Sequence, residues 1–124
     1  MDNLFVGRVK NNIEKSLRQK GFYNTTVEEV KGNIKIESPV MFAWIRLSII
    51  PTKSGKYIRE VDINNIQINS HYCRNRLFTT IMLNLKQLKT VDRIKISSVC
   101  TDAMRLWCEK NNCKKENILD YIYK

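Results

Sequence analysis

Two acidic side chains with strand-like spacing are the first candidates for chemistry in this sequence. Glu60 and Asp62 are separated by one apolar residue within the segment REVDI. Because successive side chains of a β-strand point to opposite faces, both carboxylates should lie on one face, with Val61 and Ile63 on the other. A carboxylate placed in this way can accept a proton from a reacting group. Solvent-facing carboxylates on an amphipathic strand are the simpler interpretation.

Four cysteines and one histidine form a second group, namely Cys73, Cys100, Cys108, Cys113 and His71. A zinc site would pair His71 with Cys73 and Cys108 with Cys113, but neither pair has the two-residue spacing of a zinc knuckle. No export signal accompanies the cysteines, so we expect reduced thiols. Buried, unreactive cysteines are the favoured interpretation, and no metal is expected. His71 could act as a base, but a single histidine in a turn is a weak signal.

A break in the strand pattern precedes a cluster of cations. The alternation of apolar residues slips by one position at Asn64 and Asn65. One extra residue, a β-bulge, would restore the alternation and twist the strand away from its neighbour. Arg74 and Arg76 follow, beside a helix that should begin at about residues 75–78. The backbone N–H groups and the dipole of that helix, together with two guanidinium groups, predict an anion-binding site.

Composition limits the kind of protein that carries these groups. The chain has 124 residues, of which 43% are hydrophobic and 27% charged, as expected for one folded domain over residues 1–124. No apolar run approaches the roughly 20 residues of a membrane span, and no signal peptide is recognised, so we expect a cytoplasmic protein without membrane association. The net charge of +10 favours a polyanionic partner, but the charges are spread along the chain and do not identify it.

Hydrophobic periodicity predicts an α/β or α+β domain built on one sheet. Apolar residues recur in steps of four from Phe5 to Leu17, which predicts a helix at residues 3–20 that stops at Gly21. A second helix follows Leu77, and a third occupies residues 102–111. The most hydrophobic run, residues 41–50, predicts the most deeply buried strand. Strands are expected at residues 25–30, 34–38, 41–50, 56–68, 93–99 and 117–123, the first three or four of them antiparallel.

Two segments of the chain resemble the GCN5-related N-acetyltransferases, the GNAT superfamily. INSHYCRNRLFTTIMLNL, residues 68–85, looks like the family's fourth-strand end, pyrophosphate loop and following helix. DRIKISSVCTDAMRLWCEKNNCKK, residues 92–115, is similar to its fifth strand and last helix. The resemblance covers about residues 57–115. It implies a GNAT-like mixed, mainly antiparallel sheet flanked by about three helices, with a bulged central strand splayed from the next and acetyl-CoA bound in the opening.

The resemblance also assigns roles to residues of this chain. The family's two loop glycines fall on Arg76 and Phe78, or on Leu77 and Thr79, so the loop lacks the small residues that let a backbone approach a pyrophosphate. The family's tyrosine general acid falls on Cys108 or on Trp107. The general base would be Asp62 or Glu60. The implied cofactor-binding residues are Ile66, Ile68, Arg74, Asn75, Arg76, Leu77, Phe78 and Thr79.

Three functional hypotheses follow from the sequence. The first is an acetyl-CoA-dependent N-acetyltransferase that acts on an unidentified amine. The second is a GNAT-fold module without chemistry, whose basic surface binds nucleic acid or a protein through Tyr72, Arg74, Arg76 and Phe78. The third is a homodimer, because only one strand is expected after Cys113 and its open edge could pair with a second copy.

Overall fold

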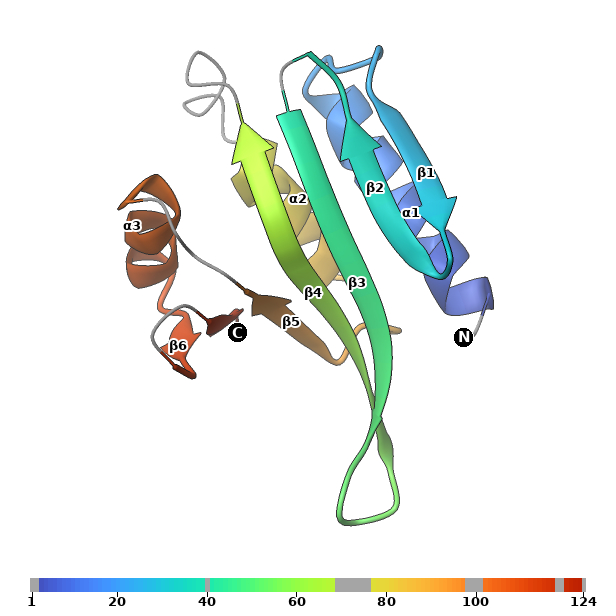
Figure 1. The fold of residues 1–124 in the computed structure, drawn as a ribbon, viewed down its shortest axis with the longest axis vertical. Coiled ribbons are helices and arrows are strands. Elements are labelled where there is room, and N and C mark those ends of the chain that lie inside the picture. Colours follow the sequence, from blue (N-terminus) through green and yellow to red (C-terminus); the bar gives the residue numbers. More distant parts are fainter. Residues whose placement is uncertain (1–2, 40, 69–76, 98–101, 118–119, 124) are drawn as a thin grey trace.

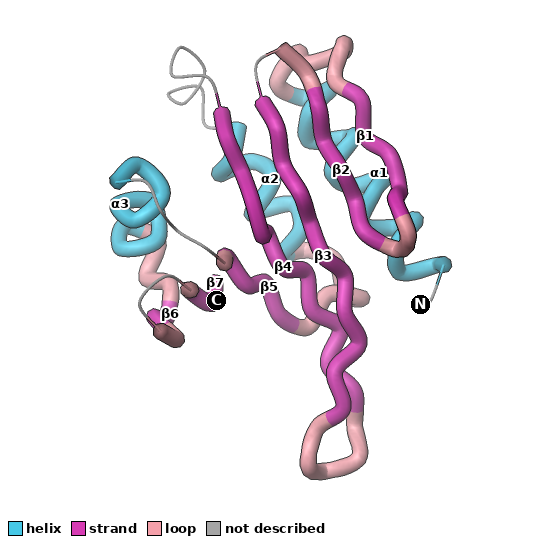
Figure 2. The backbone as a smooth tube through the Cα atoms, viewed as in Figure 1, coloured by secondary structure: helices cyan, strands magenta, loops and turns pink. Residues whose placement is uncertain are grey.

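The computed structural model describes residues 3–39, 41–68, 77–97, 102–117 and 120–123. These residues form one mixed sheet and three helices, in the predicted order apart from the last strands (Figures 1 and 2). The elements are α1 (Asn3–Gln19), β1 (Thr26–Val30), β2 (Asn33–Glu37), β3 (Met41–Pro51), β4 (Tyr57–Ile68), α2 (Leu77–Lys86), β5 (Arg93–Ile96), α3 (Asp102–Lys110), β6 (Lys114–Lys115) and β7 (Tyr121–Tyr123). The α+β class expected from the sequence is confirmed.

The sheet has the strand order β1-β2-β3-β4-β5-β7-β6. Its strands are antiparallel except for β4 and β5, which run parallel. Parallel neighbours need a crossover connection, and α2 lies within the segment that joins β4 to β5. The sheet is therefore an antiparallel meander of four strands that continues through one parallel pair.

Helices α1 and α2 cover one face of the sheet, behind the strands in Figure 1. The four-residue stripe of α1 from Phe5 to Leu17 is buried, as its spacing predicts. Gly21 follows the helix with a φ of 82°, a conformation that favours glycine. Asn84 of α2 joins the two helices, because its side-chain amide donates hydrogen bonds to Ser16 Oγ (2.7 Å) and Gln19 Oε1 (3.1 Å).

The C-terminal end of the chain differs from the prediction. In place of one strand at residues 117–123, the structure has β6 and β7 as an antiparallel pair, with Lys115 opposite Tyr121. Strand β7 lies between β5 and β6, so its edges are occupied. The expectation that the C-terminal strand offers an open edge to a second copy is therefore wrong. The edge strand on this side is β6, which is only two residues long.

The β3–β4 hairpin extends beyond the rest of the sheet, at the bottom of Figure 1. Strand β2 pairs with β3 only from Phe42 to Ile45, and β5 pairs with β4 only from Glu60 to Ile63. We call residues 49–59 the β3–β4 arm. Strand β3, predicted to be the most deeply buried, is buried at alternate positions in its first half and ends in this exposed arm.

Candidate functional site

Strand β4 contains the bulge that the sequence pattern predicts. Trp44 of β3 faces Asn65, whereas the next residue, Ile45, faces Ile63, so Asn64 is the extra residue. Pairing with β3 resumes beyond the bulge and continues to Ile68. A bulge bends the strand that carries it and increases its local twist. The slip in the apolar alternation therefore corresponds to an extra residue in β4, at Asn64.

Pairing between β4 and β5 stops where the bulge begins. The last paired rung is Ile63 with Ile96, and the backbone N–H of Ser97 donates one further hydrogen bond to the carbonyl of Ile63 at 3.0 Å. Among the described residues, the rest of β4 pairs with β3 alone. Figure 1 shows the β4 and β5 arrows pointing in diverging directions. We call residues 64–68 of β4, which lie beyond the last rung with β5, together with Ser97, the β4–β5 opening.

Glu60 and Asp62 lie on the face of β4 opposite Val61 and Ile63, as their spacing predicts. They are not solvent-facing, however, because their exposed fractions are only 6% and 9%. Glu60 Oε2 accepts a hydrogen bond from Arg93 Nε at 2.6 Å, which is also an ion pair. The interpretation of both as solvated surface carboxylates is wrong, because both side chains are buried and each accepts a hydrogen bond from β5 or the residue after it.

Asp62 is the carboxylate nearer the opening along the chain. Its Oδ1 accepts a hydrogen bond from Ser97 Oγ at 2.6 Å. Both residues are next to the last β4–β5 rung, which joins Ile63 to Ile96. Asp62 precedes Ile63, and Ser97 follows Ile96. A neutral hydroxyl donor leaves the Asp62 carboxylate without a bound cation among the described residues, in contrast to Glu60. The two carboxylates therefore differ in their partners, which are a serine hydroxyl for Asp62 and a guanidinium for Glu60.

The start of α2 supplies part of the predicted cofactor site. Leu77 and Phe78 are buried in the core, and Thr79 Oγ1 accepts a hydrogen bond from Trp107 Nε1 at 2.9 Å. The first turn of α2 contains no acidic residue, so nothing there opposes an anion at its positive end. The predicted residues Arg74, Asn75 and Arg76 lie outside the described residues, as does Tyr72.

Phe78 does not belong to an exposed aromatic patch. Only 7% of its surface is exposed, and its ring makes an edge-to-face contact with Trp107 at a centroid distance of 4.7 Å. The placement of Phe78 in a nucleic-acid surface is therefore wrong. Position 78 sits on the buried stripe of α2, with Ile81, Met82 and Leu85. Phe78 packs α2 against α3 through its contact with Trp107.

Cys108, the candidate general acid, is fully buried in α3. Burial raises the pKa of its thiol to about 12, and the neighbouring Cys113 adds to this effect. Burial also raises the pKa of Cys113. Both thiols are free, and the carbonyl of Cys108 accepts a hydrogen bond from the N–H of Cys113 at 2.9 Å. A thiol with no exposed surface has no access to a bound thioester in this conformation, which favours a packing role.

Of the residues singled out as metal ligands, only Cys108 and Cys113 are described. Within the described ranges, no group of three or more His, Cys, Asp and Glu side chains could hold a metal ion. His71, Cys73 and Cys100 lie outside those ranges.

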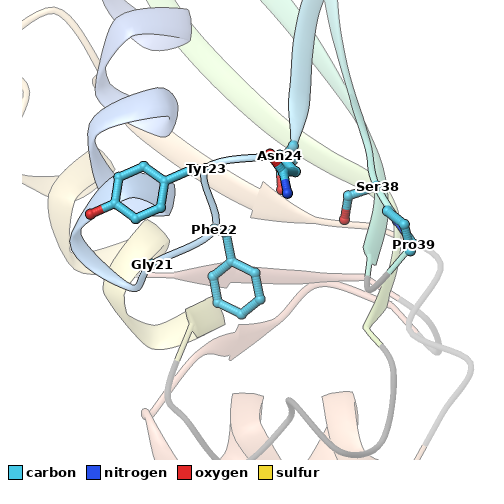
Figure 3. A pocket seen from close by; sticks show the side chains of 7 residues that line it. Gly21, Phe22, Tyr23, Asn24, Ser38 and Pro39 are labelled. Carbon is cyan, nitrogen blue, oxygen red and sulfur yellow. The ribbon is translucent and has the colours of Figure 1, made fainter.

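A cavity of about 300 Å³ lies between two connections of the chain. In Figure 3, Phe22, Tyr23 and Asn24 come from the α1–β1 connection, and Ser38 and Pro39 come from the segment that follows β2. Its described lining contains no charged side chain, and no predicted site residue within the described ranges contributes to it. No sequence pattern indicated this cavity, because its walls come from two loops that lie 13 or more residues apart and contain no motif.

A scan against protein-family models finds no match for this chain, and a search of curated proteins finds none either. No helix in the described parts of the chain combines the length and the apolar character needed to cross a membrane. Function is therefore argued from the β4–β5 opening and the groups around it.

Proposed function

We propose that the chain is a divergent GNAT-like protein that binds acetyl-CoA in the β4–β5 opening and transfers the acetyl group to an amine. The observation that carries the proposal is the coincidence of two features at one point. The bulge at Asn64 and the end of pairing at Ile63 and Ile96 occur together. Both acetyl-CoA and reduced thiols suit a cytoplasmic protein.

The opening offers unpaired backbone groups to the coenzyme. On the side where β5 has ended, residues 64–68 of β4 have no described neighbouring strand, so the N–H and C=O groups that point away from β3 would be available to a bound thioester and its pantetheine arm. The pyrophosphate would lie at the start of α2, near Leu77, Phe78 and Thr79. Arg74, Asn75 and Arg76 belong to the proposal on the strength of the sequence alone.

The proposed reaction is direct transfer. The amine nitrogen attacks the thioester carbon, a C–N bond forms, the C–S bond breaks and coenzyme A leaves as a thiolate. Asp62 would accept the proton lost by the amine, directly or through water. Glu60 would not act as the base, because its carboxylate is already ion-paired with Arg93. Cys108 would remain in the core, so we assign the proton taken up by the thiolate to solvent.

Thermal unfolding with acetyl-CoA tests the proposal. A ligand that binds only the folded state raises the melting temperature, by an amount that grows with its concentration. At a concentration 100 times the dissociation constant the stabilisation is about 2.7 kcal/mol, which is several degrees for a domain of this size. An unchanged melting temperature at millimolar acetyl-CoA would remove the proposal.

Thr80→Glu distinguishes binding at α2 from general attraction to a basic protein. An acidic side chain in the first turn stabilises a helix but repels an anion at the same end. The variant should melt at or above the wild-type temperature and lose most of the acetyl-CoA shift. Asn11→Glu, on the exposed side of α1, makes the same change in net charge and should keep the shift. If both variants lost the acetyl-CoA melting shift equally, the coenzyme would not bind at the start of α2.

A further inference from the structure

The β3–β4 arm is a two-stranded ribbon without a third strand on either side among the described residues. Strand β2 covers only the opposite end of β3, and β5 reaches β4 no further than Glu60. At the base of the arm, the Arg59 backbone is tied to Asp92 by two hydrogen bonds of 2.9 Å. Isolated ribbons of this size are marginally stable in water. The arm therefore depends on the sheet for its stability while adding little to the core.

Hydrogen bonds organise the tip of the arm. Thr52 and Lys56 close the turn, with Thr52 N donating to Lys56 O at 2.7 Å and Thr52 Oγ1 donating to the same carbonyl at 2.8 Å. Gly55 supplies the φ of 82° that the turn requires, and its N–H donates to Thr52 O at 3.1 Å. The tip is thus built as a fixed shape, which lowers the ordering cost of binding.

The arm carries three cations and no acid. Residues 49–59 contain Lys53, Lys56 and Arg59, all exposed, and no acidic residue. Two large side chains of the arm are also exposed, Tyr57 at 66% and Ile49 at 38%. Their exposure adds nothing to the stability of the fold. Elsewhere on the sheet, Lys35 and Lys95 are instead ion-paired, with Glu37 and Asp120. Positive charge and exposed apolar surface are therefore combined on one projecting element.

We infer that the β3–β4 arm binds duplex DNA, with its ribbon in the major groove and its cations on the phosphates. The major groove of B-form DNA, about 12 Å wide, admits a two-stranded β-ribbon. Lysine and arginine contacts to phosphates position such an element and supply most of its affinity. This interaction is independent of the acetyl-CoA proposal, because the arm and the β4–β5 opening lie at opposite ends of the hairpin.

Other polyanions fit the arm less well. The major groove of duplex RNA is deep and narrow, so a ribbon cannot enter it. Single strands are bound by stacking successive bases on several aromatic rings, and the arm has only Tyr57. Duplex DNA is therefore the polyanion whose shape and charge both match the arm.

Fluorescence anisotropy with a labelled 20-base-pair DNA duplex tests the inference. Three phosphate contacts predict a slope of about −2.7 for the logarithm of affinity against the logarithm of salt, or about 40-fold weaker binding at 200 mM than at 50 mM. The variant Lys53→Gln/Lys56→Gln/Arg59→Gln should lose binding and flatten this slope, and it should keep the wild-type melting temperature and acetyl-CoA response.

The matched control is Arg8→Gln/Lys15→Gln/Arg18→Gln. It removes three exposed cations from α1 and makes the same change in net charge. Wild-type DNA affinity in this control supports the inference, and equal losses in the two triple variants would overturn it, because diffuse charge would then explain the binding. No binding to the duplex would overturn it too. Equal or tighter binding to duplex RNA, single-stranded DNA or vesicles containing phosphatidylserine would contradict docking in the major groove.

Discussion

The two ends of the β3–β4 hairpin leave the sheet in different ways. Toward Ile68, β4 keeps its partner β3 and loses β5 at the bulge. Toward Tyr57, both strands leave their outer neighbours and form the β3–β4 arm. The segment from Glu60 to Ile63, between the two ends, has a neighbouring strand on both sides. Unsupported backbone at one end suits a ligand that makes hydrogen bonds, and exposed cations at the other suit a polyanion.

Truncation of a core side chain should show the largest difference along the hairpin. Ile63 is 1% exposed, so Ile63→Ala should lower the free energy of unfolding by about 3 kcal/mol through lost burial and a cavity. Ile49 in the arm is 38% exposed, and Ile49→Ala should cost less than about 1 kcal/mol. Urea unfolding measures both. Similar losses would mean that the arm is packed as tightly as the centre of the hairpin.

Removal of the proposed base should separate transfer from binding. Asp62→Asn keeps the shape of the side chain and can still hydrogen-bond to Ser97, but it takes up a proton poorly. Transfer of acetyl groups to a panel of primary amines should fall about 100-fold, with the acetyl-CoA melting shift retained. Thiol release and mass spectrometry measure the products. Full activity in this variant would exclude Asp62 as the base.

The core at α3 should lose stability at alkaline pH. The Cys108 pKa is raised in the folded state from 9.0 to about 12, so its contribution to stability is complete below pH 9 and is lost as the pH rises toward 12. The wild type should lose about 1 kcal/mol more stability than Cys108→Ala between pH 8 and pH 10. Equal losses, measured by urea unfolding, would mean that the thiol is not buried.

The arm variant should show the smallest effect on stability. The side chains of Lys53, Lys56 and Arg59 are exposed and make no described ion pair, so their replacement by glutamine should change the unfolding free energy by less than about 0.5 kcal/mol. The same urea measurements test this expectation. A larger loss would show that these cations support the fold.

Local periodicity was sufficient to predict much of the fold. The apolar step in α1 and the slip at Asn64 each reflect a geometric repeat that side chains must obey when one face is buried. Strand β6 was missed because two consecutive lysines carry no alternation, and its pairing with β7 depends on a distant turn. Pairing between strands that are joined by a turn cannot be predicted from the few residues of one strand.

The burial of the site residues could not be predicted for a different reason. The buried carboxylates of Glu60 and Asp62 accept hydrogen bonds from Arg93 and Ser97, which are 33 and 35 residues away in the chain. The hydrophobicity of residues 41–50 likewise does not reveal where β2 stops pairing with β3, and that limit determines which part becomes the arm. Phe78 was misplaced because its contact with Trp107 joins two separate helices.

Titration of the amide NMR spectrum with coenzyme A tests the central claim most directly, because it reports both ends of the hairpin in one experiment. Binding in the β4–β5 opening predicts shifts at residues 64–68, at Ser97 and at the first turn of α2, with residues 52–56 of the arm unchanged. Shifts confined to the arm, or no shifts at millimolar coenzyme A, would contradict the account.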